Sequence, residues 1–285
     1  MWSWWPPLEG LSITSAANGV KGTYGRIRAM RIVRYSHQGD VGFGIHEDET
    51  VAAIGPHPFG AFEYTGQRLP VAEVRLLAPV LPSKVVAVGR NYAEHARELG
   101  NEVPATPVLF LKPSTSVIGP GDPIVRPEGV GQVDFEGELA VVVGKLVRRL
   151  TPAEAIQAVL GFTCANDVTA RDLQRADGQW TRAKGFDTFC PLGPWIETDL
   201  DSSDLAISTL VNGEPRQQAR TSQLEHGVAD LLAFVSQVMT LLPGDVLLTG
   251  TPAGVGPLEP GDRVEVEVEG VGILANEVVP EPPRT

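Results

Sequence analysis

Three carboxylates at alternate positions interrupt a stretch of the chain that otherwise has the composition of a buried strand. The segment VDFEGELAVVVGK, residues 133–145, places Asp134, Glu136 and Glu138 ahead of three consecutive valines. Side chains two residues apart in a strand point to the same face, so these charges would lie together and repel one another. Either that face is open to water, or a cation lies there with the carboxylates as its ligands. Taken alone, the segment favours the open face.

Another carboxylate from a different strand could complete a cation site. Asp167 lies in the segment CANDVTARD, where an apolar strand turns polar. Mg²⁺ takes oxygen ligands in an octahedral arrangement and keeps several waters or substrate oxygens, so a cluster of carboxylates would suit it. By itself, Asp167 is better explained as a turn residue at a strand end or as a helix cap.

A histidine and a glutamate on a short predicted helix could form a general base. His95 and Glu98 lie three residues apart in GRNYAEHARELG, where the pattern predicts a helix from Tyr92 to Leu99 that Gly100 ends. A carboxylate beside an imidazole orients the ring and raises its basicity. The alternative is a solvated helix face with no catalytic role.

Two further polar features stand out in the second half of the chain. Lys184 lies in TRAKGFDTF, at an abrupt change from polar residues to a loop that contains glycine, and its alternative reading is a surface lysine. The Gly-rich segment GTPAGVG, residues 250–256, follows a predicted strand. Its backbone N–H groups and the Thr251 hydroxyl could hold an anion. It is not a P-loop, because the Gly-Lys-Ser/Thr ending is missing.

Composition limits the classes of function. The chain has 285 residues, which suits one large domain or one domain with a small appendage. Its formal net charge of −12 argues against nucleic acid and anionic membranes as partners. The two cysteines, Cys164 and Cys190, have neither zinc-site spacing nor a disulfide framework, so we expect buried thiols in a reducing cytoplasm. No apolar run approaches the length of a transmembrane helix.

Strands dominate the predicted elements, which indicates an α+β fold that is mainly β, with a large mixed sheet or roll. Residues 1–29 are predicted to be a disordered extension, with Met30 as a candidate true start; a genuine but poorly ordered extension is the alternative. Residues 30–78 are predicted to form a small β-rich subdomain and residues 84–281 the catalytic domain. The predicted strands comprise residues 31–36, 41–46, 50–55, 84–89 and 107–113 and a hairpin that turns at Asn212-Gly213. The predicted helices comprise residues 92–99, 151–161 and 228–242, and the second begins with a capping box from Thr151 to Glu154.

Seven motifs occur together in one order and spacing over residues 84–278: GRNYAEHARE, PVLFLKPST, VDFEGELAVVVGK, ANDVTARDLQ, KGFDTFCPLGPWI, VNGEPRQ and LTGTPAGVG. Together they resemble the fumarylacetoacetate hydrolase family. The preceding strands resemble the small N-terminal domain of its bacterial branch, which includes 2-hydroxyhepta-2,4-diene-1,7-dioate isomerases and acylpyruvate hydrolases. The resemblance implies a mixed β-roll that is usually a homodimer.

The resemblance also assigns expected roles to the polar residues. It implies an Mg²⁺ or Mn²⁺ ion, with Asp134 as a neighbour that shapes the field rather than a ligand. The expected metal ligands are Glu136, Glu138 and Asp167, the expected catalytic residues are His95 with its partner Glu98 and Lys184, and the expected substrate-binding residues are Arg90, Gln174 and Thr251.

The implied substrates are small 2-oxo acids and diacids, which react through an enolate that the metal stabilises. The expected reactions are C–C bond hydrolysis of acylpyruvates or isomerisation of 2-hydroxyhepta-2,4-diene-1,7-dioate in the breakdown of aromatic compounds. Oxaloacetate decarboxylation is an alternative, and a catalytically silent ligand-binding homologue is an alternative of another class. Residues 98–106 and 174–180 are expected to set substrate length, and the second segment could be a mobile lid or an ordinary surface loop.

Overall fold

The structure is a computed structural model that describes residues 29–283, so the predicted extension lies outside the described residues except for its last residue. The described chain is mainly β, as predicted. Its strands form one large sheet of twelve strands, a second sheet of five and a third sheet of three. No helix in the described part is long and apolar enough to cross a membrane.

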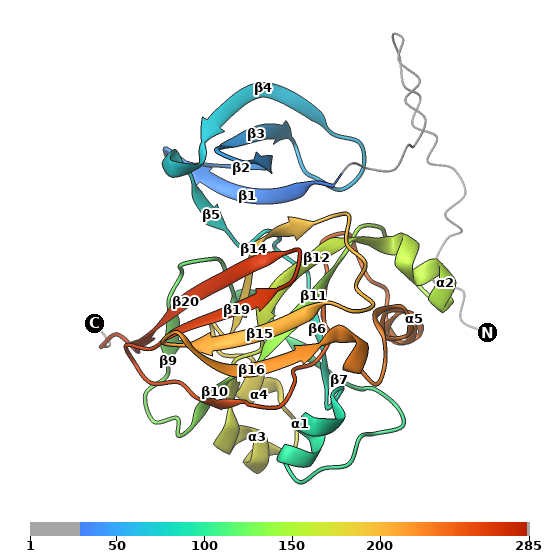
Figure 1. The fold of residues 1–285 in the computed structure, drawn as a ribbon, viewed down its shortest axis with the longest axis vertical. Coiled ribbons are helices and arrows are strands. Elements are labelled where there is room, and N and C mark those ends of the chain that lie inside the picture. Colours follow the sequence, from blue (N-terminus) through green and yellow to red (C-terminus); the bar gives the residue numbers. More distant parts are fainter. Residues whose placement is uncertain (1–28, 284–285) are drawn as a thin grey trace, which may run out of the picture.

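The first five strands form a small antiparallel unit that Figure 1 shows above the larger part of the molecule. Strand β1 pairs with β2 and also with β14 of the larger part, so the two parts share one continuous sheet. The pattern predicted the first three strands. It missed β4 because seven of its eight residues are exposed, which leaves no apolar alternation to detect. The strands are β1 (Arg31–His37), β2 (Asp40–Glu47), β3 (Thr50–Gly55), β4 (Glu63–Pro70) and β5 (Arg75–Leu77).

The centre of the large sheet is buried on both faces. All seven residues of β11 are buried, and they alternate between two hydrophobic cores: Leu139, Val141 and Val143 pack on one side, and Ala140 and Val142 pack on the other. Burial on both faces explains why this strand is a continuous apolar run. The remaining strands of this sheet are β6 (Val85–Gly89), β7 (Val108–Lys112), β8 (Val117–Ile118), β11 (Gly137–Val143), β12 (Val159–Asn166), β14 (Cys190–Glu197) and β17 (Val246–Leu248).

The five-stranded sheet packs against one face of the large sheet, because Ile207, Val266 and Leu274 share a core with the apolar residues of β11. Strands β15 and β16 of this sheet form the predicted hairpin, with Asn212 and Gly213 at positive φ in the turn. The strands of this sheet are β9 (Ile124–Arg126), β15 (Ala206–Val211), β16 (Glu214–Arg220), β19 (Arg263–Val268) and β20 (Gly272–Pro280), and those of the third sheet are β10 (Val133–Phe135), β13 (Thr169–Ala170) and β18 (Gly256–Pro257).

The helices are short. The predicted capping box at Thr151 is present, but the helix that it begins has only four residues and continues as a 3₁₀ turn into β12. The helix predicted over residues 228–242 ends earlier, and two helices that flank Gly178 were not predicted. The helices are α1 (Ala93–Glu98), α2 (Pro152–Ala155), α3 (Arg171–Asp177), α4 (Thr181–Lys184) and α5 (Val228–Val238), and the 3₁₀ turns are η1 (Val71–Glu73), η2 (Ser114–Ser116), η3 (Ile156–Ala158) and η4 (Thr221–Gln223).

The carboxylate-bearing segment is not the single strand that its alternation predicts. The chain leaves β10 of the third sheet at Phe135 and enters β11 of the large sheet at Gly137, so Glu136 occupies the break between two sheets. The backbone of Glu136 is held there by two hydrogen bonds. Its N–H donates to Asn166 Oδ1 at 2.9 Å, and its carbonyl oxygen accepts from the N–H of Asp167 at 2.8 Å.

Candidate active site

A cavity of about 460 Å³ lies beside this break and collects nearly all the polar residues that the sequence singled out. Its size falls within the range of small-molecule sites. All nine residues predicted for the site, apart from Glu98, line the cavity directly. The lining also includes Val88, Gly89, Leu99, Asn101, Phe110, Arg171, Arg175, Gly178 and Trp180.

The predicted metal ligands lie together. Glu136, Glu138 and Asp167 are buried, and each offers one carboxylate oxygen that lies within 4.8 Å of the other two. They come from the strand break, from β11 and from the residue that follows β12. The register of the sheet explains why the three carboxylates lie together. Gly137 separates the two glutamates and pairs directly with Asn166, the residue before Asp167.

Two buried lysines bind this cluster. Lys184 Nζ donates to Glu136 Oε2 at 2.7 Å and to Asp167 Oδ2 at 2.6 Å. Lys112 Nζ donates to Asp167 Oδ1 at 2.6 Å, and its side chain is fully buried. The motifs in the sequence do not point to Lys112. The signal was nonetheless present, because a lysine ends the apolar strand VLFLK, and buried lysines in proteins are almost always paired.

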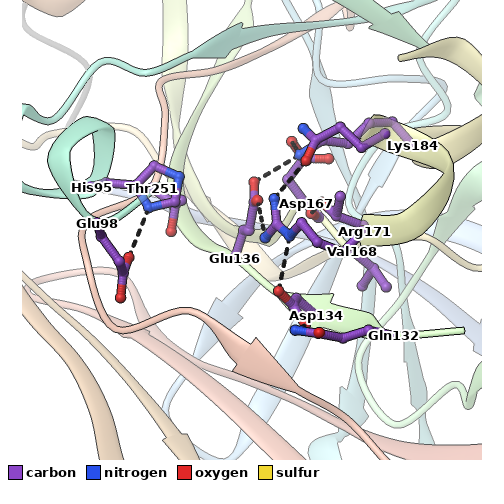
Figure 2. A network of polar contacts seen from close by, with 12 residues as sticks. His95, Glu98, Gln132, Asp134, Glu136, Asp167, Val168, Arg171, Lys184 and Thr251 are labelled. Atoms are coloured by element: carbon purple, nitrogen blue, oxygen red, sulfur yellow. Dashed lines mark hydrogen bonds and ion pairs between the residues drawn. The ribbon is translucent and has the colours of Figure 1, made fainter. Parts of the chain in front are cut away.

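Arg171, which was also missed, explains why Asp134 is tolerated. Its guanidinium donates to Asp134 Oδ2 at 2.9 Å, to Glu136 Oε1 at 2.8 Å and to Gln174 Oε1 at 2.7 Å. Figure 2 shows Asp134 on the far side of Arg171 from Lys184. Asp134 also accepts from Gln132 Nε2 at 2.7 Å. Asp134 is thus satisfied by protein groups, and its place outside the ligand set stays a prediction.

Burial and neighbouring charges change the acidity of these groups in opposite directions. Burial raises the pKa of Glu138 well above its usual value, and the charges of Asp167 and Glu136 add to the rise. Burial also acts to raise the pKa of Glu136, but the charges of Lys184 and Arg171 outweigh it and hold that pKa below its usual value. Glu138 is therefore the carboxylate whose charge the protein's own cations compensate least.

The donor set fits a divalent metal ion. Four carboxylates in this region face three cations (Asp134, Glu136, Glu138 and Asp167 against Lys112, Arg171 and Lys184), which leaves one buried negative charge without compensation. Carboxylate oxygens are the ligands that hard cations prefer. The buried cluster of Glu136, Glu138 and Asp167 could hold such an ion.

The predicted base and its partner are hydrogen-bonded. His95 Nδ1 lies 3.2 Å from Glu98 Oε2, and His95 is buried at the cavity wall. When Nδ1 carries the hydrogen that Glu98 accepts, Nε2 keeps a free lone pair. The Gly254 N–H holds Glu98 in turn, by donating to Glu98 Oε1 at 3.0 Å. In the view of Figure 2, Glu136 lies between this pair and the Lys184 and Arg171 side chains.

Backbone amides of the Gly-rich loop bind carboxylates of the protein itself. Besides the Gly254 amide, the Gly250 N–H donates to Glu138 Oε2 at 2.6 Å. Both glycines have a φ of 101°, and a Cβ at position 254 would lie 2.1 Å from the carbonyl oxygen of Arg216. The sequence suggests these amides as an anion site, and the structure shows two of them bonded to Glu98 and Glu138.

The hydroxyl of Thr251 is bonded on both sides. It donates to the carbonyl oxygen of Gly137 at 2.9 Å and accepts from Gln217 Nε2 at 2.7 Å. Gln217 was missed because it comes from β16, a strand whose other residues are mostly exposed. Its Oε1 accepts from the Gly137 N–H at 2.9 Å. Gln217 thus ties the Gly-rich loop to the strand that carries the glutamates.

Family models match both parts of the described chain. Residues 84–279 match the family described as Fumarylacetoacetate (FAA) hydrolase C-terminal, and residues 30–79 match the family Rv2993c-like, N-terminal. Protein Rv2993c of Mycobacterium tuberculosis is 52% identical over 260 residues, which cover 88% of this chain and 98% of that protein.

Two further relatives have names that state a reaction. The crystal structure of 2-hydroxyhepta-2,4-diene-1,7-dioate isomerase from Mycobacterium marinum is similar with 50% sequence identity and a TM-score of 0.84, over 89% of this chain and 100% of that chain. Oxaloacetate tautomerase Fahd2a, mitochondrial, of Rattus norvegicus is 46% identical over 223 residues, which cover 74% of this chain and 71% of that protein. The chain therefore belongs to the fumarylacetoacetate hydrolase family.

Proposed function

We propose that this protein is a divalent-metal-dependent enzyme that moves a proton on small 2-oxo acids, as an isomerase or tautomerase. One observation carries the proposal: a hydrogen-bonded imidazole–carboxylate pair, His95 and Glu98, lies at the same cavity as the three-carboxylate cluster. Such a pair is a general base, and a carboxylate cluster suits Mg²⁺ or Mn²⁺. The names of the two relatives, an isomerase and a tautomerase, denote reactions of the same kind.

Charge balance supports an anionic substrate. With all four carboxylates ionised, the cluster and its three buried cations carry one uncompensated negative charge, so a divalent cation would leave one excess positive charge there. The carboxylate of a 2-oxo acid would balance it. A divalent ion held by Glu136, Glu138 and Asp167 would supply Lewis acidity toward the oxygens of such an acid.

The chain's own residues would transfer the proton, stabilise developing charge and bind the substrate. His95 Nε2 would take a proton from the carbon next to the keto group, while Glu98 holds the ring and stabilises the imidazolium that forms. Lys184 would hold Glu136 and Asp167 in place and stabilise negative charge that develops on the substrate. Gln174 would donate from its amide nitrogen, because Arg171 already occupies its oxygen.

Hydrolysis of acylpyruvates is a second candidate, because the cavity of about 460 Å³ has room for a water molecule beside a small acid. In that reaction His95 would deprotonate the water that attacks the distal carbonyl group. Decarboxylation of oxaloacetate needs no base, since loss of CO₂ gives the enolate directly. We also propose that the enzyme is a homodimer, as family resemblance implies.

Replacing His95 separates these reactions. With Mg²⁺ or Mn²⁺ present, we expect His95→Ala to reduce tautomerisation of oxaloacetate and hydrolysis of acylpyruvates by about 100-fold or more, and to reduce decarboxylation far less. His57→Ala, which changes an exposed histidine in the N-terminal unit, is the matched control. Equal losses in all three activities would refute the role of the base. Absence of all three activities from the metal-loaded wild-type protein would favour the silent homologue.

A further inference from the structure

Helix α3 presents two arginines, Arg171 and Arg175, to the cavity. Arg171, Gln174 and Arg175 all line the cavity, and their spacing of three and four residues places them on one side of the helix. Arg171 is bonded to Asp134, Glu136 and Gln174. Arg175 comes one turn later, about 6 Å further along the axis.

Arg175 has no ion-pair or hydrogen-bond partner among residues 29–283. The acids of its own helix are engaged elsewhere, because Asp177 pairs with Arg182 and Asp172 accepts from the Gln132 N–H. The Arg175 side chain is exposed at the rim of the cavity, so its guanidinium is available to a ligand.

A second arginine, Arg90, lines the same cavity and is also without an ion-pair partner in the described part of the chain. Its guanidinium carbon lies 5.9 Å from the centre of the Trp180 ring. The backbone of Arg90 has a φ of 62°. Trp180 packs directly on Gly89, where a Cβ would lie 2.5 Å from the ring. A guanidinium that packs against an aromatic ring keeps N–H groups free to bind a carboxylate.

Aromatic side chains connect this arginine to the carboxylate cluster. Lys184 Nζ, which binds Glu136, lies 5.0 Å from the centre of the Phe110 ring. The Phe110 and Trp180 rings meet edge to face with centres 5.2 Å apart, and the Arg90 guanidinium packs near the Trp180 ring. Two apolar rings and two arginines without ion-pair partners, Arg90 and Arg175, thus line the same cavity as the carboxylate cluster.

From this arrangement we propose that Arg175, together with Arg90, forms a second anion subsite that takes the distal carboxylate of a 2-oxo dicarboxylic acid. The apolar carbon chain of the acid would lie along Phe110 and Trp180. The subsite determines specificity and takes no part in the proton transfer. The inference rests on the proposed function only for the 2-oxo acid group at the opposite end.

The test uses two acids that differ only at the distal end, 2-oxoheptanedioate and 2-oxoheptanoate. Calorimetric titration of Mg²⁺-loaded protein should show that the wild type binds the diacid at least about tenfold more tightly than the methyl-ended acid. In Arg175→Gln this preference should fall to about threefold or less, with affinity for 2-oxoheptanoate unchanged. Arg175→Lys should retain part of the preference, and Arg148→Gln, which removes an exposed arginine outside the cavity, should retain all of it.

Three results would overturn the subsite: equal binding of both acids by the wild type, equal weakening of both acids by Arg175→Gln, or no binding of either acid. Turnover of oxaloacetate and acylpyruvates is measured separately on the same preparations. An Arg175-dependent preference without turnover would support the subsite while the proposed function fails. Turnover without the preference would support the proposed function while the subsite fails.

Discussion

Replacement of Glu138 by glutamine tests whether Glu138 carries the uncompensated negative charge at the candidate metal site. The glutamine side-chain oxygen can still accept from the Gly250 N–H, so the packing is kept while one negative charge is removed. In the metal-free wild type, Glu138 faces Glu136 and Asp167 with oxygens within 4.8 Å. At an effective dielectric constant of about 20, two unit charges at that distance repel each other by about 3.5 kcal/mol.

Because of this repulsion, Glu138→Gln should raise the stability of the metal-free protein and should reduce the stabilisation that metal binding provides. Burial and the two neighbouring charges raise the pKa of Glu138 in the folded protein above its value in the unfolded chain. The folded state therefore has the full stability contribution of a protonated Glu138 below the unfolded-state pKa, and it loses this contribution as pH rises through the folded-state pKa. Near pH 8 and without metal, Glu138→Gln should therefore be more stable than the wild type. With metal at about 100 times its dissociation constant, the wild type should gain about 2.7 kcal/mol, or about 5–10 °C in melting temperature.

Thermal unfolding with EDTA and with Mg²⁺ or Mn²⁺ measures both effects. Loss of a direct ligand should weaken metal binding by at least about 100-fold, since even outer-shell changes cost 10- to 100-fold, so at the same metal concentration the gain in Glu138→Gln should fall to about 0.4 kcal/mol or less. Glu277→Gln, which neutralises an exposed carboxylate on β20, should behave as the wild type in both conditions. A full metal-dependent rise in Glu138→Gln would refute the ligand assignment, and lower metal-free stability would refute the repulsion.

Lys112→Met should lower the free energy of unfolding in urea by about 3 kcal/mol, because it leaves Asp167 without one of its two buried partners, whereas exposed Lys145→Met should change it by less than about 0.5 kcal/mol. Gly254→Ala should reduce turnover about tenfold or more at unchanged metal affinity, since the loop must move and release Glu98; unchanged kcat would contradict this. Burial raises the pKa of both cysteine thiols to about 12, so neither should react with a disulfide reagent at pH 8 before unfolding. Those thiols stay protonated in the folded chain and ionise in the unfolded chain above about pH 9, so stability should fall there by up to about 1.4 kcal/mol per pH unit for each thiol.

The sequence predicted elements whose signal is local. The hairpin at Asn212-Gly213 follows from residues that accept positive φ, and the capping box at Thr151 follows from hydrogen bonds within one turn. The alternation of the carboxylates suggested that Asp134, Glu136 and Glu138 share one strand. The break at Glu136 could not be read from that pattern, because it depends on pairing with two different sheets.

The missed polar residues act through contacts between distant segments. Lys112 and Asp167 are 55 positions apart, and Gln217 and Thr251 are 34 positions apart. Arg171 lies only four positions from Asp167, yet its bonds reach back to Asp134 and Glu136. Family resemblance supplied the proposed ligands and base, and the supporting cations became visible only in the folded structure.

The two glycine amides that hold Glu138 and Glu98 belong to one loop of five residues, 250–254. That loop acts as a spacer, because it sets how far the proposed base lies from the carboxylates. Arg175 is carried by another element, α3, and is exposed at the rim. Because Arg171 of the same helix holds Glu136, the accepted acid can be changed independently of the reacting groups only by substitutions that keep α3 and the Arg171 bonds in place.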